Sequence, residues 1–198
     1  MMHREGKIFV ISGPSGSGKT TLIKNLFRNR RLNSLLTKSI SCTTRPRRSG
    51  ERNGKDYFFV RTEEFKEGLK AKKILEWTEY LGYYYGTPRS FVDAQLKKGK
   101  SIILCLDLKG ALRIKKLYPK QTSTIFILPP SIKELSQRIK QRCNRTKKEE
   151  VNNRVQLASK EVLDSKKYDY RVVNKDLIPA SNRLKDIVLE ELNSSLHQ

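Results

Sequence analysis

The sequence is poor in the residues on which much of enzyme chemistry depends. It has only two histidines, His3 and His197, both near the ends of the chain, so histidine-based catalysis or metal binding is not expected. Its three cysteines, Cys42, Cys105 and Cys143, are odd in number and lack metal-ligand spacing. They therefore indicate reduced intracellular thiols rather than a disulfide framework or a zinc site.

Long apolar runs are also missing. No stretch of the 198 residues approaches the roughly 20 apolar residues of a membrane-spanning helix. The first five residues lead straight into the apolar run Lys7–Ile11, with no signal-peptide pattern. We therefore expect a cytoplasmic protein with no membrane span, long enough for one α/β domain with a real core.

Acidic residues are scarce relative to basic ones. The chain has 42 Lys and Arg against 20 Asp and Glu, a formal net charge of +22. Such a balance favours anionic partners but does not choose among nucleotides, nucleic acid and acidic membrane surfaces. No base-stacking or groove-reading motif accompanies the charge, so nucleic acid is not expected as a partner. Many lysines, such as Lys97 and Lys98, can simply keep a helix end solvated.

The most informative pattern is the glycine-rich segment Gly13–Thr20, which reads G-x-x-x-x-G-K-T. It follows the apolar run Lys7–Ile11 and precedes a segment with helical periodicity, which is the strand–loop–helix context of a P-loop. Successive backbone N–H groups of such a loop converge at a helix N-terminus and favour phosphate. The residues expected to bind a triphosphate are Gly13, Pro14, Ser15, Gly16, Ser17, Gly18, Lys19, Thr20 and Thr21.

Two side chains of this motif carry specific chemistry. Lys19 can reach the β- and γ-phosphates, and the hydroxyl of Thr20 can be a ligand of Mg²⁺. The alternative is a glycine-rich turn that matches by chance. The motif predicts a nucleoside triphosphate but does not say what is done with it.

Strand and helix patterns alternate along the chain, which predicts a single α/β domain built on a doubly wound parallel sheet. The segment from Ser39 to Gly86 interrupts the alternation with antiparallel-type signals and indicates an inserted subdomain. Predicted strands are Ile8–Ser12, Asp56–Val60, Ile74–Tyr80, Tyr83–Tyr85, Ser101–Leu106, Thr124–Leu128 and Tyr170–Val173. Predicted helices begin near Gly18, at Thr62 as a capping residue and at Pro88, and cover Ser131–Arg142, Val151–Leu163 and Lys175–Leu192.

A first polar cluster lies in the inserted segment, where Ser41 to Glu51 combines hydroxyl residues with Arg45, Arg47 and Arg48. Guanidinium groups beside hydroxyls suit bidentate recognition of a phosphate or carboxylate. A solvated basic loop is the alternative.

A second cluster joins Glu76 and Trp77 to the aromatic run Tyr83–Thr87. Trp77 and some tyrosines could simply be core. Glu76 lies among hydrophobic residues, where a carboxylate needs hydrogen-bond donors. Guanine offers a ring N–H and an amine on one edge, whereas adenine does not.

A third cluster is basic and contains Arg138 and Arg142, with Arg154 beyond it. Arg138 and Arg142 are four residues apart on one helix face, where like charges repel, and no acid within the run relieves this. An external anion could supply the missing charge, as arginines do for phosphates in phosphoryl transfer. A solvated basic helix is the alternative.

Asp107 follows the predicted strand Ser101–Leu106, at the edge where open α/β sheets place ligand groups. It could orient a nucleobase, an arginine or a metal-bound water. Cys105 is expected on the same face of the strand.

Taken together, these motifs resemble the guanylate kinase family from Lys7 to about Leu192. The P-loop is widely shared, and the specific part is the order of several further blocks. These blocks are Ser41–Arg45 with Arg48, Gly50-Glu51, Gly54–Tyr57, Glu76-Trp77, Tyr84–Thr87 and Asp107.

The resemblance implies a role for each matching residue. The GMP phosphate would be held by Ser41, Arg45, Arg48, Tyr57 and Tyr85, with Glu51 counted among the GMP-binding residues. Glu76 and Thr87, with Asp107 nearby, would recognise the guanine. Arg138, Arg142 and Arg154 would act with Lys19 on the ATP phosphates, with Mg²⁺ as cofactor.

The resemblance also implies a layout in three parts: a core of residues 1–38, 88–130 and 161–198, a GMP-binding region 39–87 and a lid 131–160. Three positions depart from the family pattern. Cys105 stands where an acidic residue is usual, Lys109 stands where Gln is usual, and the lid is one residue longer between Arg142 and Arg154.

The implied activity is Mg²⁺-dependent transfer of the γ-phosphoryl group of ATP to GMP or dGMP, in a monomer or homodimer. Two alternatives remain open. A catalytically silent scaffold module of the same fold would lack P-loop residues, whereas Lys19 and Thr20 are present. A sibling kinase of a phosphorylated sugar would not need Glu76 and Thr87.

Overall fold

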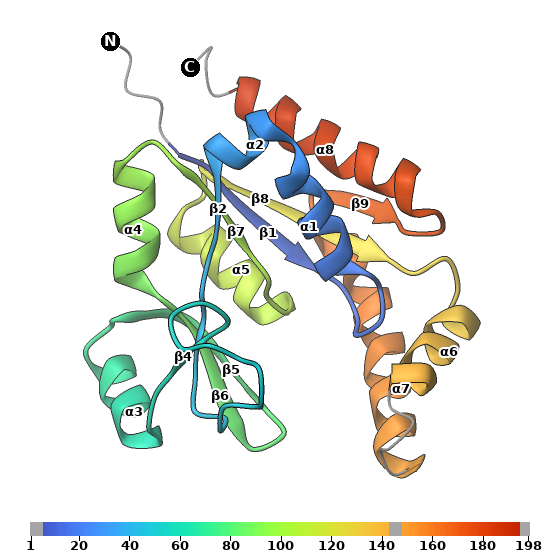
Figure 1. The fold of residues 1–198 in the computed structure, drawn as a ribbon, viewed down its shortest axis with the longest axis horizontal. Coiled ribbons are helices and arrows are strands. Elements are labelled where there is room, and N and C mark those ends of the chain that lie inside the picture. Colours follow the sequence, from blue (N-terminus) through green and yellow to red (C-terminus); the bar gives the residue numbers. More distant parts are fainter. Residues whose placement is uncertain (1–5, 143–147, 195–198) are drawn as a thin grey trace. The chain divides into compact units, whose positions relative to one another are not determined.

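The computed structural model describes residues 6–142 and 148–194, and the chain divides into two compact units (Figure 1). The first unit comprises residues 1–8 and 36–122, and the second comprises residues 9–35 and 123–198. Both units combine parallel strands with helices, as the alternating pattern predicted.

The first unit contains one parallel strand pair and one separate four-stranded sheet. In the pair, β2 (Leu36–Lys38) lies beside β7 (Ser101–Leu104). The four-stranded sheet has the order β4-β3-β6-β5. Its strands are β4 (Phe58–Phe59), β3 (Cys42–Thr43), β6 (Tyr83–Pro88) and β5 (Ile74–Tyr80). The helices of this unit are α3 (Thr62–Lys70), α4 (Arg89–Lys97) and α5 (Leu108–Leu117).

The two faces of the four-stranded sheet carry different residues, because side chains alternate along each strand and paired residues share a face. Cys42 pairs with Phe58 and with Gly86, which sets one row of residues on one face. Thr43 pairs with Phe59 and with Tyr85, which sets the next row on the opposite face.

The β5–β6 hairpin closes through a tight turn. Leu81 and Gly82 both have positive φ, 52° and 76°, which matches the two-residue turn that fits the twist of a hairpin. The predicted strand–turn–strand at this position is therefore confirmed.

The second unit is built on three strands in the order β1-β8-β9. These are β1 (Ile8–Ser12), β8 (Thr122–Leu128) and β9 (Tyr170–Val173), of which β8 and β9 are parallel. Its helices are α1 (Lys19–Arg28), α2 (Arg30–Leu35), α6 (Ile132–Arg142), α7 (Lys148–Leu163) and α8 (Leu177–Ser194), with a 3₁₀ turn, η1 (Asp164–Lys167). Every residue of β1 is buried, which explains its uninterrupted apolar run.

In the second unit, the first helix of the chain packs against the last one. Helices α1 and α8 lie side by side in Figure 1, and the Asn25 side-chain amide of α1 donates to the Ser181 hydroxyl of α8 at 3.2 Å. Leu184, Ile187 and Val188 are each fully buried on the inner face of α8. This face is the stripe expected of a helix that covers a sheet.

Several local expectations need correction. Arg61, and not Thr62, is the residue before the first turn of α3, and the Glu64 carboxylate accepts from its backbone N–H at 2.8 Å. The predicted strand Asp56–Val60 is only Phe58–Phe59, and Ser101–Leu106 ends at Leu104 because Asp107 starts a helix. The elements that sequence reasoning missed are α2, β2, β3 and α5.

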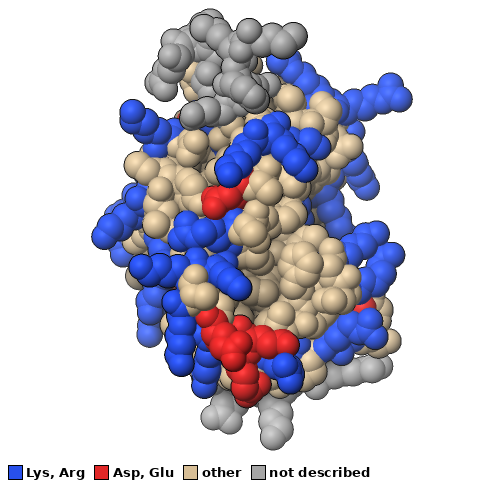
Figure 2. Space-filling model, turned by 90° about the vertical axis from the view of Figure 1, so that its left-hand side faces the viewer, with Lys and Arg blue, Asp and Glu red and all other residues tan. Residues whose placement is uncertain are grey.

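Basic and acidic side chains are distributed differently on the surface. On the face in Figure 2, Lys and Arg side chains are spread widely and acidic side chains gather mainly in one group. No helix within residues 6–142 and 148–194 is long and apolar enough to cross a bilayer.

The inner face of α8 supplies a direct test of the fold. We expect Leu184→Ala to lower the free energy of unfolding by about 2–5 kcal/mol, because a fully buried leucine leaves a cavity. The control is Ile178→Ala in the same helix, where the side chain is 75% exposed and the effect should stay within about 0.5 kcal/mol. Urea unfolding measures both, and equal losses would contradict this packing.

Candidate functional site

The glycine-rich loop between β1 and α1 has the backbone that its motif predicted. Gly13, Gly16 and Gly18 all have positive φ, of 144°, 86° and 92°. A Cβ on Gly18 would lie 2.1 Å from the side-chain nitrogen of Asn174, and one on Gly13 would lie 2.5 Å from a backbone oxygen. Both glycines are therefore required by conformation and by space.

Lys19 is folded back over this loop. Its ammonium donates to the carbonyl of Gly13 and, at 2.9 Å, to that of Pro14. The charge therefore already lies among the backbone groups expected to meet phosphate. Ser15, Thr20 and Thr21 are exposed, so the Thr20 hydroxyl is accessible to a bound ion.

The Ser17 hydroxyl is the one side-chain group of the loop that is buried without a hydrogen-bond partner in the part of the chain that the structure describes. Its side chain is fully buried, and its hydroxyl has no hydrogen-bond partner among the described residues. Buried polar atoms without partners are rare in proteins and each needs an explanation. Because the hydroxyl is buried, a ligand at the surface of the loop does not reach it in this conformation.

Asn174 is a residue of this site that sequence reasoning missed. Its side-chain amide donates to the Ser17 carbonyl at 2.7 Å, and its backbone N–H donates to the Leu128 carbonyl at 2.8 Å. It thus ties the loop to the ends of β8 and β9. Its place directly after a predicted strand was the available signal, because ligand sites of α/β sheets form at that edge.

Helix α6 packs against the loop and brings Arg138 to it. A Cβ on Gly16 would lie within 3.6 Å of Leu135, Ile139 and the Arg138 Cβ. Leu135 and Ile139 also form a small apolar cluster with Ala158 of α7. The P-loop, α6 and α7 are therefore one packed group.

The surroundings of Arg138 differ from the expectation, because an acidic side chain lies close to its guanidinium. Glu134, one turn earlier, approaches its guanidinium at 3.4 Å, so an acid just outside the basic run partly relieves the repulsion. Arg142 ends α6 and Arg154 lies within α7, but their side chains lie outside the described residues. Among residues 6–142 and 148–194, no cluster of three or more acidic, histidine or cysteine side chains could hold a metal ion.

A second group of predicted residues meets in the first unit, around Arg45. Arg45 is 8% exposed, and its guanidinium donates to both oxygens of Glu51, at 2.7 and 2.9 Å. It also lies over the rings of Tyr57 and Phe59, 5.6 and 5.8 Å from their centroids. Bidentate hydrogen bonds and cation–π contacts of this kind hold an arginine side chain in one orientation.

Glu51 acts here as the partner that aims Arg45. Its carboxylate also accepts from the backbone N–H of Arg48 at 2.9 Å, and the hydrogen bond from Arg45 holds its pKa below the usual value. The Arg48 side chain itself is exposed. The loop is therefore ordered by Glu51, while Arg48 remains exposed to solvent.

Two tyrosines complete this group. The rings of Tyr57 and Tyr85 meet edge to face at 6.0 Å, and burial raises the pKa of Tyr57. The Tyr57 hydroxyl therefore stays neutral at physiological pH and can donate a hydrogen bond. Ser41 lies half-buried one residue before β3, and its carbonyl accepts from Phe58.

The Glu76 carboxylate is the most unusual group of the first unit. It is 3% exposed and accepts a hydrogen bond from the Thr87 hydroxyl at 2.5 Å. The register of β5 shifts by one between Ile74 and Trp77, so Leu75 and Glu76 together oppose Thr87. Such a β-bulge re-aims a side chain, and here it turns Glu76 toward Thr87.

Burial and charge act together on this carboxylate. Burial raises the pKa of Glu76 to about 7, and the charge of Asp107 pushes it in the same direction. The hydrogen bond from Thr87 and the charge of Arg113 oppose the rise. Glu76 is thus half protonated near neutral pH until other donors stabilise its charge.

Asp107 has a local structural role besides the three alternatives considered for it. It is the N-cap of α5, and its carboxylate accepts from the Gly110 backbone N–H at 2.8 Å. A Cβ on Gly110 would lie 2.8 Å from a carboxylate oxygen of Glu76. The helix start therefore brings Asp107 and Gly110 to the buried carboxylate. Cys105 is exposed near this point.

A cleft of about 420 Å³ opens beside Glu76. Arg113 lies in its wall and donates from Nε to the Leu75 carbonyl at 2.7 Å, which pins the bulged strand. Gly110 and Arg113 are further residues that sequence reasoning missed, because the helix that carries them was not predicted. The cleft is lined by Glu76, Trp77, Thr78, Glu79, Lys109, Gly110 and Arg113.

Comparison with known proteins gives one consistent result. Residues 5–191 match the family model described as guanylate kinase. A guanylate kinase of Bacillus cereus is 42% identical over 191 residues, which cover 96% of this chain and 91% of the relative. One of Thermotoga maritima is 42% identical over 187 residues, which cover 94% and 88% of the two chains.

A solved structure agrees with these sequences. The crystal structure of guanylate kinase from Anaplasma phagocytophilum matches 97% of this chain and 89% of its own, with a TM-score of 0.75 and 33% sequence identity.

The buried Glu76 carboxylate predicts how stability depends on pH. Between pH 4.5 and about 7 the folded chain keeps a proton that the unfolded chain releases, so the free energy of unfolding falls as pH rises. The contribution of this one group is about 3 kcal/mol. In Glu76→Gln it should disappear, so urea unfolding at pH 5 and pH 8 should differ less than in the wild type. The same pH dependence in both proteins would contradict the burial of this charge.

Proposed function

The chain belongs to the guanylate kinase family, and from this we propose how its own residues carry out the reaction. The activity is transfer of the γ-phosphoryl group of ATP to GMP, which yields ADP and GDP. The observation that carries the assignment of the acceptor is the buried Glu76 carboxylate bonded to Thr87. A kinase acting on a phosphorylated sugar has no use for such a pair.

The donor half of the reaction is assigned to the P-loop. Its backbone N–H groups and the Lys19 ammonium would hold the β- and γ-phosphates of ATP. The positive-φ glycines support this, because they allow the backbone conformation that a phosphate-binding loop needs. The intact Lys19 and Thr20 speak against a silent scaffold module.

Magnesium fits the donor half as part of the nucleotide complex. Mg²⁺ prefers a few protein oxygens together with phosphates and waters, so an exposed Thr20 hydroxyl is sufficient and a carboxylate cage is not required. When bound, the ion would neutralise charge that develops on the phosphates. Arg138, Arg142 and Arg154 would place positive charge close to the phosphoryl group during its transfer.

The acceptor half is assigned to the four-stranded sheet of the first unit. Arg45, held by Glu51, would bind the GMP phosphate with help from the Tyr57 and Tyr85 hydroxyls. Ser41 and Arg48 would complete this set. Glu76 would accept hydrogen bonds from the guanine N1–H and amine, with Thr87 and Asp107 beside it.

Catalysis then depends on position and charge more than on covalent chemistry. The acceptor phosphate oxygen has to meet the γ-phosphorus in line with the leaving oxygen, and each held phosphate raises the effective concentration of the other. We further propose the division into a core (1–38, 88–130 and 161–198), a GMP-binding region (39–87) and a lid (131–160). A place in purine nucleotide metabolism and a cytoplasmic location follow from the nature of the substrates.

Removal of the Lys19 charge tests the donor half. We expect Lys19→Ala to lower kcat/KM by about 10²–10³-fold or more, because one preorganised charge on the transferring group is lost. The fold should survive, and circular dichroism and thermal unfolding check this. The matched control is Lys24→Ala, an exposed position in the same helix that should retain wild-type activity. Comparable losses in both variants would overturn the assignment.

Removal of the Glu76 charge tests the acceptor half. We expect Glu76→Gln to raise KM for GMP by about 10–100-fold, because two charge-assisted hydrogen bonds are weakened, while KM for ATP stays within about twofold. The matched control is Glu79→Gln in the same strand, where the side chain is exposed.

A coupled assay that varies one nucleotide at a time separates the two Michaelis constants. Equal losses for both nucleotides in Glu76→Gln would contradict the guanine assignment. Substitution at Glu79 that raised KM for GMP as much would contradict it as well.

A further inference from the structure

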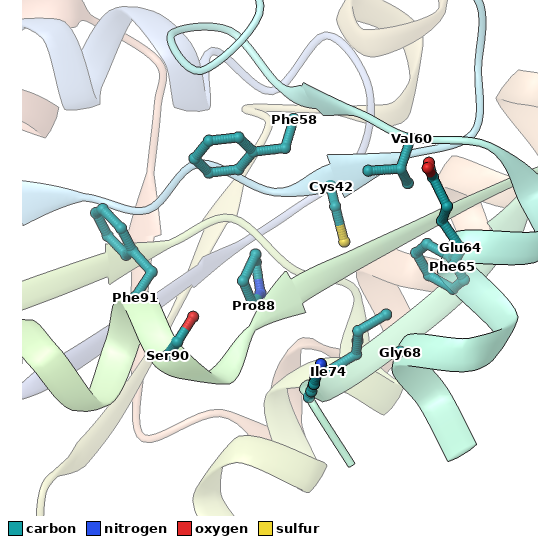
Figure 3. Close-up of a pocket in the computed structure, with 11 residues that line it drawn as sticks. Cys42, Phe58, Val60, Glu64, Phe65, Gly68, Ile74, Pro88, Ser90 and Phe91 are labelled. Atoms are coloured by element: carbon teal, nitrogen blue, oxygen red, sulfur yellow. The ribbon is translucent and has the colours of Figure 1, made fainter. Parts of the chain in front are cut away.

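A second cavity, of about 540 Å³, lies in the first unit and is unused by the reaction (Figure 3). Volumes of this size accept drug-sized ligands. Its walls come from strands β3, β4 and β6, from the residues around β5, and from helices α3 and α4. The lining residues are Cys42, Phe58, Val60, Glu64, Phe65, Gly68, Lys73, Ile74, Pro88, Ser90 and Phe91.

The cavity lies on the opposite face of the sheet from the proposed acceptor residues. Cys42 and Phe58 are paired and both line it, whereas the next pair along, Thr43 and Phe59, faces the other way. On that other face the Phe59 ring lies under Arg45. Neighbouring residues of the same short strands therefore serve the two sites.

The walls are mostly apolar. Phe58, Phe65 and Phe91 supply aromatic surface, and Figure 3 shows Phe58 and Phe91 at one end of the opening. Burial raises the pKa of the Cys42 thiol to about 11, so this group stays neutral and behaves as a small apolar side chain. An apolar body would therefore fill this space.

The charged groups that line the cavity differ in whether they already have a partner of opposite charge. The Glu64 carboxylate is already occupied by the backbone and guanidinium of Arg61, at 2.8 and 3.0 Å. Lys73 is exposed and forms no ion pair among the described residues. The uncompensated charge of the rim is thus positive, and Ser90 adds a hydroxyl donor.

We propose that this cavity is a regulatory site for a small amphipathic carboxylate, whose apolar body fills the space and whose anion meets Lys73. Occupancy alters GMP affinity, because β3, β4 and β6 form both the cavity wall and the acceptor face. By linkage, GMP changes the affinity of the carboxylate by the same factor. The binding step stands by itself, whereas the coupling step rests on the proposed acceptor site.

The chain contains its own reporter of occupancy. Trp77 is the only tryptophan in the sequence, and it meets Tyr84 edge to face at 5.6 Å. Tyr84 in turn stacks on Phe65 of the cavity wall at 5.5 Å. A ligand that moves Phe65 therefore changes the fluorescence of Trp77.

The test titrates the full chain, without nucleotide, with 4-phenylbutanoate and with its neutral match 4-phenylbutanamide. We expect a saturable change in Trp77 fluorescence and about tenfold tighter binding of the carboxylate, as one charge-assisted hydrogen bond allows. Lys73→Gln should abolish the preference for the carboxylate. Lys70→Gln, an exposed lysine of α3 outside the cavity, should keep it.

Two filling variants check the location. Val60→Phe and Gly68→Leu place larger side chains in the cavity from different elements, and each should abolish binding; two variants guard against one that fails to fold. Val173→Phe, at an exposed position of β9, is the size-matched control. Saturating carboxylate should change KM for GMP at least threefold in the wild type and not in the filled variants.

Several outcomes would overturn the proposal. These are the absence of both a saturable fluorescence change and binding heat, unchanged binding in folded Val60→Phe or Gly68→Leu, and simple competition with GMP. Binding without any change in KM for GMP would reject the regulatory role and leave only a cavity. Activity with ATP and GMP in the absence of carboxylate tests the proposed function separately.

Discussion

A carboxylate buried in an apolar strand is the constraint around which the first unit is organised. An unpaired carboxylate there is unfavourable by several kcal/mol, so the surroundings of Glu76 must either donate to it or leave it protonated. The bulge in β5 turns it to Thr87, and Arg113 holds the bulged strand through the Leu75 carbonyl. The start of α5 supplies Gly110, where a Cβ would lie 2.8 Å from a carboxylate oxygen of Glu76.

In the second unit, the corresponding constraint is the glycine-rich loop, which has to hold backbone amides and positive charge close together. Its loop is shaped by left-handed glycines and held by Asn174, and α6 packs against it with Arg138 on the near side. These groups are held in place by contacts within the chain itself. Preorganised dipoles and charges of this kind need no rearrangement when a phosphoryl group is transferred, and this is where their catalytic value lies.

Sequence reasoning predicted most of the helices and strands, and it named the residues of the proposed site, for identifiable reasons. The P-loop could be predicted because its glycines, Lys19 and the flanking periodicities are all local in sequence. The burial of Glu76 could be predicted from its apolar neighbours. The bulge that aims it could not, because a register shift depends on the partner strand.

The missed features have different causes, and only one of them is distance along the chain. Asn174 acts on Ser17 across more than 150 residues, and no local pattern records that contact. Helix α5 was missed because Asp107 was considered only as a ligand group and not also as a helix cap. Glu134 lay just outside the basic run that was considered.

The folded-back position of Lys19 has a consequence for which molecules the loop can accept. Because its ammonium already donates to two carbonyls, a ligand competes with those acceptors for the charge of Lys19. A neutral or singly charged group gains little from that exchange, whereas a chain of phosphates offers stronger acceptors and also meets the loop amides. The loop thus discriminates by charge before it discriminates by shape, and weakly charged solutes in the cell compete poorly for it.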